Sequence, residues 1–467
     1  MAALALGPGA KPALAHGVGV GEAPPLPIWL FLVGTALVLG VSFAALVVLR
    51  PDPHLEESRW RPLPAGLSGV LSSRSVEVLC GLVGVLLLVV VVVSGIRGTQ
   101  VTKDNLAPTF VYVTFWLGMV GVSVVFGDVF RAFNPWRACG RVVALVSAKA
   151  AGGPLPPPLR YPDRLGRWPA VVGLTAFAFL ESAVAGSDQP DRVAVAVLIY
   201  SALTFLGMAL FGVEAWSQRG EAFSVYFNLL SRMSPLERRG GRLGLRPPLS
   251  GLRGLEQLPG TVALMGVMIG SVSFDGLSAG PTWQKIVAPV KGLFESAGFG
   301  SIQAIELVYA LGLVATIALV AGFYRVGAAG AASVGGGLSA GQVARAFVHS
   351  LVPIAAVYSA AHYVSLLLLQ GQAIVPLASD PLGQGRNLFG TSDAGVDLQA
   401  IAPETFWWIQ LALVLAGHVG ALGVAHDRAL ALYADRGLAA RSQYRMLGVM
   451  ICFTTFALWL LSEAGKG

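Results

Sequence analysis

Ten apolar stretches, each about as long as one membrane crossing, recur along this chain of 467 residues. A bilayer core of about 30 Å takes about 20 apolar residues per helical crossing. In chain order, we predict spans at 28–49, 76–96, 108–126, 169–186, 193–213, 258–277, 304–323, 346–369, 405–425 and 446–462. The expected fold class is therefore all-α, a polytopic helical membrane bundle of about ten transmembrane helices.

The composition supports this prediction. Hydrophobic residues make up 55% of the chain and charged residues 12%, whereas soluble domains carry about 25% charged residues. Of the three cysteines, Cys80 and Cys452 fall within predicted spans and Cys139 in a loop, so we expect no disulfide and no cysteine metal cluster. These values exclude a soluble globular enzyme, a disordered chain and a small disulfide scaffold.

The distribution of basic residues predicts the orientation. Lys and Arg collect in cytoplasmic loops, and an outside N-terminus places 24 of the 32 basic residues in inside segments. We therefore predict a multi-pass protein of the cell membrane with both termini outside. The basic excess faces anionic cytoplasmic lipid, so membrane lipid is the expected partner and no nucleic acid is needed.

The spans and this orientation divide the chain. A tail at 1–27 precedes a single transmembrane domain at 28–462, and a second outside tail follows at 463–467. The long cytoplasmic loops are 127–168 and 214–257, and the long outside loops are 278–303 and 370–404.

The first tail contains Ala13-Leu14-Ala15, which has the small-x-small form of a signal-peptidase site. Cleavage there would expose His16, whose α-amine and imidazole could chelate a metal outside the cell. The alternative is an uncleaved outside tail.

Two outside segments have recognisable patterns. Segment 281–299 is amphipathic and is expected to be an interfacial helix. In loop 370–404, Leu382, Leu388 and Phe389 are expected to anchor a packed lid.

The span at 258–277 contains several helix-weakening residues, among them Pro259, Gly260, Gly266 and Gly270. One interpretation is an interrupted helix that lines a cavity, as in transporters. The other is a glycine-rich face for tight helix packing.

Ionisable residues within spans are functional candidates, because each costs about 2.5 to 3.5 kcal/mol at mid-membrane. Asp275, Glu306 and His362, together with Glu181, are predicted at similar outer depth, and His418 lies on the span that follows His362. These side chains could form a metal or proton site. The alternative is that each makes an ordinary hydrogen bond between helices.

A second group is predicted near the inner surface, where Asp128 and Glu214 lie at span ends beside His349 and His426. They could form another polar cluster. The alternative is that each charge is paired locally at the membrane interface.

Several short segments resemble those of a known family: Ala15-His16-Gly17, Asn105 to Phe110, Phe133 to Arg137, Ala361-His362-Tyr363, Asp380 to Gly383, Asn387 to Gly390, and His418 to Arg428. With these, the chain resembles the bacterial polytopic membrane proteins labelled fenitrothion hydrolase-like, over almost its whole length. The resemblance implies hydrolysis of an organophosphate triester.

Two functions follow as hypotheses. In the first, the protein is a metal-dependent hydrolase of an apolar organophosphate-type ester, with His362, Glu306 and Asp275 as catalytic residues. One divalent transition metal (Zn, Mn or Fe) would be held by ligands from His362, His418, Glu306, Asp275 and His16 and would activate water. In the second, the same intramembrane residues serve a transporter or a proton- or metal-ion-handling protein, whose partner is the transported ion.

The orientation is directly testable. Reporter fusions after Arg253 and after Arg445 should report a cytoplasmic location, and a fusion near Asp393 an outside one, because basic residues resist translocation. The reverse result at all three sites would overturn the predicted orientation.

Overall fold

The computed structural model describes residues 25–55, 59–433 and 435–464. A helix or a run of helices occupies each of the ten predicted spans, and the all-α membrane bundle is thereby confirmed. In chain order these are α1 (Ile28–Leu49), α3 (Arg74–Arg97), the run of α4 (Leu106–Pro108), η2 (Thr109–Leu117) and α5 (Gly118–Phe126), α8 (Trp168–Ala183), α9 (Pro190–Phe211), α12 (Thr261–Ala279), α14 (Ser301–Ala332), the run of α15 (Ala340–Phe347), η5 (Val348–Ser350) and α16 (Leu351–Leu369), α18 (Pro403–Leu432) and α19 (Arg436–Ala464).

Shorter elements connect these helices: α2 (Ala65–Leu71), η1 (Thr102–Asp104), α6 (Val129–Phe133), α7 (Pro135–Ala150), η3 (Asp163–Leu165), α10 (Val213–Arg219), α11 (Ala222–Ser231), η4 (Ser250–Gly254), α13 (Pro281–Ser296), η6 (Gln370–Ala373) and α17 (Ile374–Ser379). A small antiparallel sheet has the order β1-β3-β2, with β1 at Arg61–Pro62, β2 at Leu236–Arg239 and β3 at Arg242–Leu245. Leu236 of β2 lies opposite Leu245 of β3.

Nine helical segments of the described chain are long and apolar enough to cross a membrane. The predicted span at 169–186 is the exception, because α8 has only 16 residues and reaches about 24 Å at 1.5 Å per residue. The chain leaves helical geometry at Val184 and turns at Gly186, whose φ of +70° favours glycine.

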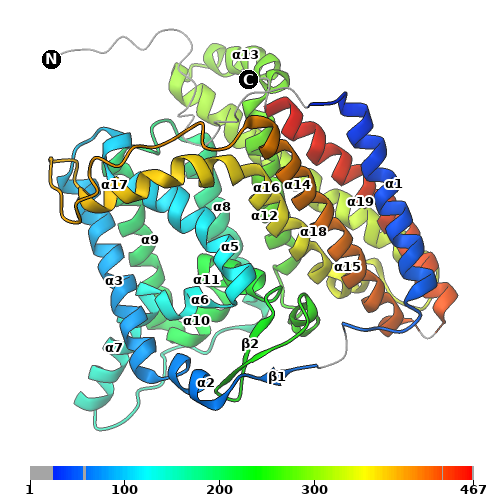
Figure 1. Ribbon diagram of the computed structural model, residues 1–467, viewed down its shortest axis with the longest axis horizontal. Coiled ribbons are helices and arrows are strands. Elements are labelled where there is room, and N and C mark those ends of the chain that lie inside the picture. Colours follow the sequence, from blue (N-terminus) through cyan, green and yellow to red (C-terminus); the bar gives the residue numbers. More distant parts are fainter. Residues whose placement is uncertain (1–24, 56–58, 434, 465–467) are drawn as a thin grey trace.

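The helices form two lobes, which lie side by side in Figure 1. The first lobe runs from α3 to α11 and also carries η6 and α17, whereas the second contains α1, the helices from α12 to α16, α18 and α19. Helix α12 connects the lobes, since it packs on α8 of the first and on α14, α16 and α19 of the second.

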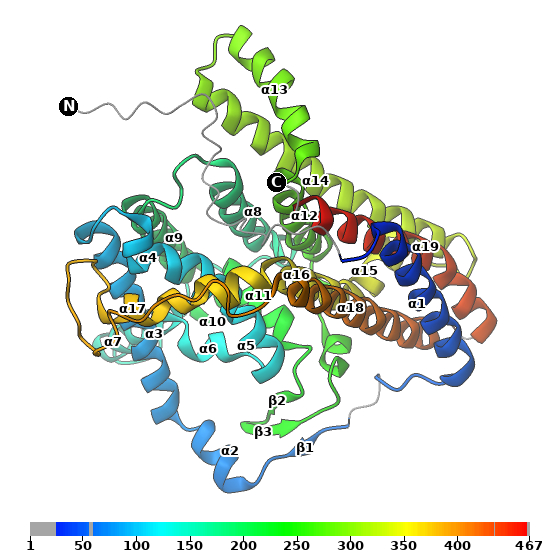
Figure 2. The ribbon, with the colours of Figure 1, turned by 45° about the horizontal axis from the view of Figure 1, so that its top comes forward.

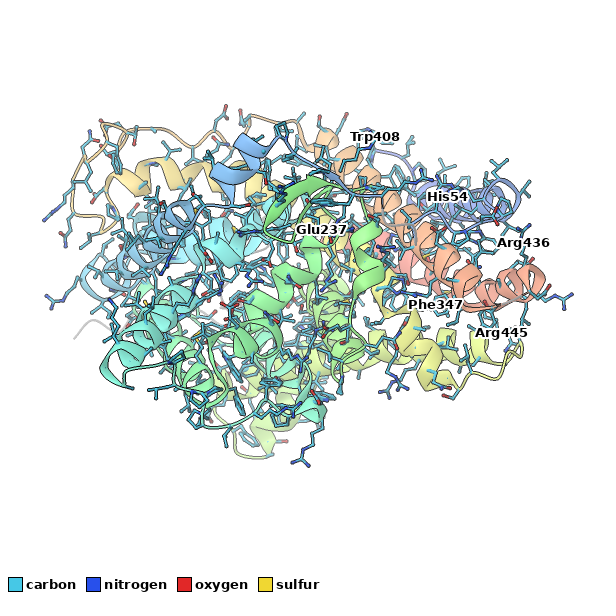
Figure 3. The ribbon with its side chains drawn as sticks, turned by 90° about the horizontal axis from the view of Figure 1, so that it is seen from below. His54, Glu237, Phe347, Trp408, Arg436 and Arg445 are labelled. Carbon is cyan, nitrogen blue, oxygen red and sulfur yellow. The ribbon has the colours of Figure 1, made fainter. Side chains whose placement is uncertain are left out.

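Segments predicted to share a side of the membrane lie at the same end of the molecule. In Figure 1, α2, α7 and β1 lie at the bottom, whereas α13, α17 and the C-terminal end of α19 lie at the top. Figure 3 views the bottom end, where His54 and Glu237 come from two further segments that are predicted to be inside. The fold therefore has the relative sidedness that the basic residues indicate.

Helix α12 is continuous, so the prediction of an interrupted helix at 258–277 is wrong and the packing alternative holds. A Cβ added to Gly270 would lie 2.6 Å from Cα of Ile317 on α14, and one added to Gly266 would lie 3.3 Å from Cβ of Ala321. Glycine at these positions lets α12 and α14 approach closely.

Two other spans depart from regular α-helical geometry. The span that begins at Leu106 contains the nine-residue π-helical segment η2, and the span of α15 and α16 contains a turn of 3-10 helix at η5. Such departures from α-helix are frequent at functional sites and hinges.

Polar contacts hold loop 370–404 in place. The prediction that apolar residues anchor this loop is wrong for two of the three residues named. Leu388 is 58% exposed and Phe389 is 72% exposed. Asp380 instead accepts the backbone N–H groups of Gln384 and Gly385. The loop also joins the segment before α4, because the N–H of Thr99 bonds to the carbonyl of Leu382.

Segment 281–299 contains a helix, as predicted. Helix α13 buries Trp283 and Val287 and leaves Leu293 exposed. It packs on the first turns of α14, and Figure 2 shows α13 and this first part of α14 projecting from the rest of the bundle.

The segment predicted as loop 214–257 contains regular secondary structure. It contains α10, α11 and the β2–β3 hairpin, and α11 buries Tyr226, Phe227 and Leu230 almost completely. At ten residues, α11 is largely apolar but too short to span the membrane, which is typical of a buried core helix.

We predict that Gly270→Val destabilises the protein, because the added side chain meets the backbone of α14. Overpacking of this kind costs about 1 to 3 kcal/mol, and thermal unfolding of the purified protein would measure it. Gly322→Val on α14 is the matched control, since a Cβ there has no atom within 4 Å. Equal loss of stability in both variants would contradict the packing explanation.

Candidate functional site

Asp275 and His362 form a partly buried acid–imidazole pair within the bundle. Asp275 lies on the last turns of α12, His362 lies on α16, and Nε2 of the imidazole is 2.8 Å from Oδ2 of the carboxylate. Their side chains are 16% and 9% exposed. Gly276 gives the ring room, since a Cβ there would lie 3.4 Å from Cε1 of His362.

Two more polar side chains adjoin this pair. The Tyr363 hydroxyl donates to Asp275, and its ring packs edge-on against the imidazole with centroids 4.6 Å apart. Glu181, 7% exposed on α8, interacts electrostatically with Asp275. We call Glu181, Asp275, His362 and Tyr363 the polar cluster.

The polar cluster lies where the two lobes meet. Glu181 comes from the first lobe, whereas the other three residues come from α12 and α16 of the second. Of the outer group expected from the sequence, the structure thus brings Asp275, His362 and Glu181 together.

Glu306 makes a different contact. Its Oε1 accepts the backbone N–H of Ala185 at 3.0 Å and so stabilises the turn after α8. His418 on α18 is also engaged locally, with Nδ1 2.7 Å from the carbonyl oxygen of Val414, one turn earlier. Each of these bonds is typical of a structural polar residue within a membrane bundle.

The described residues do not assemble the predicted metal ligands. Across 25–55, 59–433 and 435–464, no group of three or more His, Cys, Asp or Glu side chains is placed to hold a metal ion. Asp275 and His362 provide two neighbouring donors, and His16 lies outside the described residues. This donor set does not fit the expected metal centre, and metal binding stays a prediction.

The second predicted group, near the inner surface, is dispersed among separate partners. Asp128 accepts from Asn228 at 2.9 Å, and burial raises the pKa of its carboxyl. His426 lies 3.0 Å from the carbonyl oxygen of Arg50. Local pairing is therefore the correct alternative for these residues.

Glu214 belongs to an ion-pair network on the same side. Arg137, with a side chain only 7% exposed, contacts Glu214 at 2.8 Å and Glu77 at 2.9 Å. Hydrogen bonds and charge attraction from these carboxylates outweigh burial and raise the pKa of Arg137. The network connects α3, α7 and α10 at the predicted inner end.

Sequence reasoning missed a second buried network, centred on Glu221. This carboxylate accepts the N–H groups of Phe223 and Ser224 at the start of α11, and it also accepts from Asn134 and Tyr200. A carboxylate at the start of an apolar helix is a recognisable signal, because negative charge is stabilised at a helix N-terminus, but the residue lay in a segment predicted to be a loop.

Comparison with known proteins returned no matching family model, no matching curated protein and no matching solved structure.

Proposed function

We propose that this integral membrane protein handles protons in its interior, through Asp275 and His362, as part of moving a solute or an ion across the membrane. The single observation that carries the proposal is the hydrogen bond between these side chains inside the bundle. Ionisable groups at membrane depth mark proton relays and ion pathways, because their cost requires a function or a partner.

The chemistry of the pair suits proton exchange. Neutral imidazole is the side chain whose charge changes nearest physiological pH. A proton added to His362 gives an imidazolium that the Asp275 carboxylate stabilises, and its release restores neutral imidazole. Tyr363 supplies a further donor to the same carboxylate and fixes its orientation.

The position of Glu181 supports coupling to movement. Its carboxylate interacts electrostatically with Asp275 across the junction of the lobes, and two carboxylates repel each other when both are ionised. Protonation at this junction changes the attraction between the lobes. A ligand that binds two conformations unequally shifts their populations, and a proton is such a ligand.

Proton flux into sealed vesicles tests the proposal. The reconstituted protein should acidify the lumen, as reported by an enclosed pH-sensitive dye, when a pH gradient and a membrane potential are imposed. Asp275→Asn and His362→Gln should reduce the flux to that of protein-free vesicles, because neither variant keeps the hydrogen-bonded carboxylate–imidazole pair. His418→Gln is the matched control, since Nδ1 of this buried histidine bonds to the carbonyl oxygen of Val414 on its own helix.

If the protein is instead the hydrolase that the family resemblance implies, different results are expected. Detergent-solubilised protein would hydrolyse an aryl phosphotriester without any gradient, would contain a divalent transition metal by elemental analysis, and would lose turnover in His362→Ala. That result, or unchanged proton flux in Asp275→Asn vesicles, would overturn the proton-handling proposal.

A further inference from the structure

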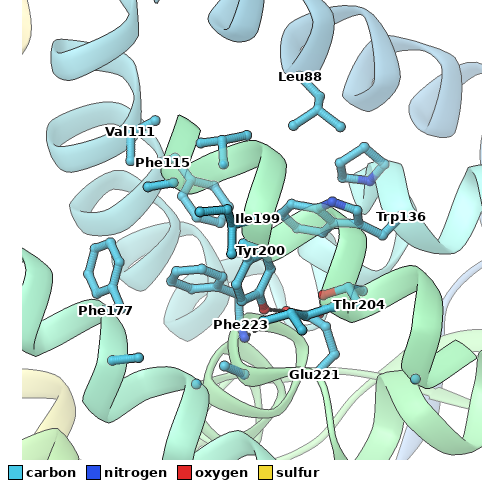
Figure 4. Close-up of a pocket in the computed structure, with 18 of the residues that line it drawn as sticks. Leu88, Val111, Phe115, Trp136, Phe177, Ile199, Tyr200, Thr204, Glu221 and Phe223 are labelled. Atoms are coloured by element: carbon cyan, nitrogen blue, oxygen red, sulfur yellow. Dashed lines mark hydrogen bonds between the residues drawn. The ribbon is translucent and has the colours of Figure 1, made fainter. Parts of the chain in front are cut away.

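A large apolar cavity lies within the first lobe. Its volume is about 980 Å³, and residues of α3, η2, α8, α9 and the start of α11 line it. Figure 4 shows its aromatic and aliphatic walls, which include Leu88, Val111, Phe115, Phe177, Ile199 and Phe223. Neither Asp275 nor His362 lines it.

The cavity is elongated along the helices. On α9, its lining runs from Val193 to Phe211, and on the opposite side it runs from Trp168 to Val184. At 1.5 Å per residue, these stretches extend over about 24 to 27 Å. The cavity therefore follows most of a hydrocarbon core that is about 30 Å thick.

The cavity faces lipid between α8 and α9. These consecutive helices pack on different partners: α8 lies against α11, α12 and α14, whereas α9 lies against α3, α4, α7 and α10. Lining residues on both sides also reach the outer surface, with Val172 67% exposed on α8 and Leu203 60% exposed on α9. A membrane-dissolved molecule can thus enter sideways without crossing water.

Three of the polar side chains on the wall are engaged with one another. The Tyr200 hydroxyl bonds to Glu221, and Thr204 bonds to Tyr200. Figure 4 shows these three side chains together at one side of the cavity. Because a polar solute would find few available partners on the remaining wall, its desolvation would be costly.

We propose that this cavity binds one hydrocarbon chain of a membrane lipid, which enters between α8 and α9. The wall is almost entirely apolar, and the length of the cavity along the helices matches an extended chain better than a compact molecule. Binding from lipid replaces one apolar environment with another, so the gain comes from close contact with the aromatic walls. This proposal is independent of proton handling at Asp275 and His362.

Photo-crosslinking of the full chain tests the proposal. The protein is reconstituted into vesicles that contain phosphatidylglycerol with a diazirine on one acyl chain, and the cross-linked residues are mapped by mass spectrometry. We expect cross-links on Val197 and Leu180, which line the cavity, in excess over Val195 and Leu198, which face outward from α9. Equal labelling around α9 would indicate ordinary surface lipid and would overturn the proposal.

A cavity-filling variant provides the second arm. Ala196→Trp places a large side chain in the cavity and should remove the cross-links on Val197 and Leu180, whereas Ala202→Trp, exposed on the same helix and outside the lining, should keep them. Ala176→Trp fills the cavity from α8 and replaces Ala196→Trp if that variant unfolds at a lower temperature than the wild type. Retained cross-links in a folded filling variant would overturn the proposal.

Displacement of the lipid label by an aryl phosphotriester, but not by unlabelled lipid, would instead assign the cavity to a compact apolar solute.

Discussion

The hydrocarbon core of a bilayer offers no water to polar groups, and the interior of this protein is arranged around that constraint. At several helix ends and buried polar side chains, a partner comes from within the protein. Glu306 accepts the N–H of Ala185 after α8. Asn105 bonds to the carbonyl groups of Ser94 and Thr99, and its own oxygen accepts the N–H of Ala107. Such bonds let the chain turn and restart at membrane depth.

Helix α12 is the structural centre of this arrangement. Its glycines bring it close to α14 on one side, and it also contacts α8, α16 and α19. This central position allows Asp275 to meet side chains from both lobes. The close packing that holds the bundle together and the placement of the polar cluster therefore depend on the same helix.

The two lobes carry different kinds of interior. At their junction the structure concentrates polar groups, and inside the first lobe it leaves an elongated apolar space. Trp116 and Phe177, with ring centroids 4.7 Å apart, belong to the aromatic layer of the first lobe, and Trp116 also stacks on Tyr226 of α11. Proton handling at the junction and lipid binding in the cavity are thus separable proposals.

The sequence by itself determined the positions of the ten helices and their relative sidedness, because apolar length and basic residues are local properties that the membrane selects directly. It also indicated Asp275 and His362, since a charged or titratable residue within a span is costly wherever it lies. Only the tertiary structure decided that these two residues pair while Glu306 caps a turn and His418 bonds to its own helix. Contact between helices depends on their rotation and neighbours, which hydropathy does not encode. The same reason explains why the continuity of α12, the exposure of Phe389 and the cavity between α8 and α9 emerged only in three dimensions.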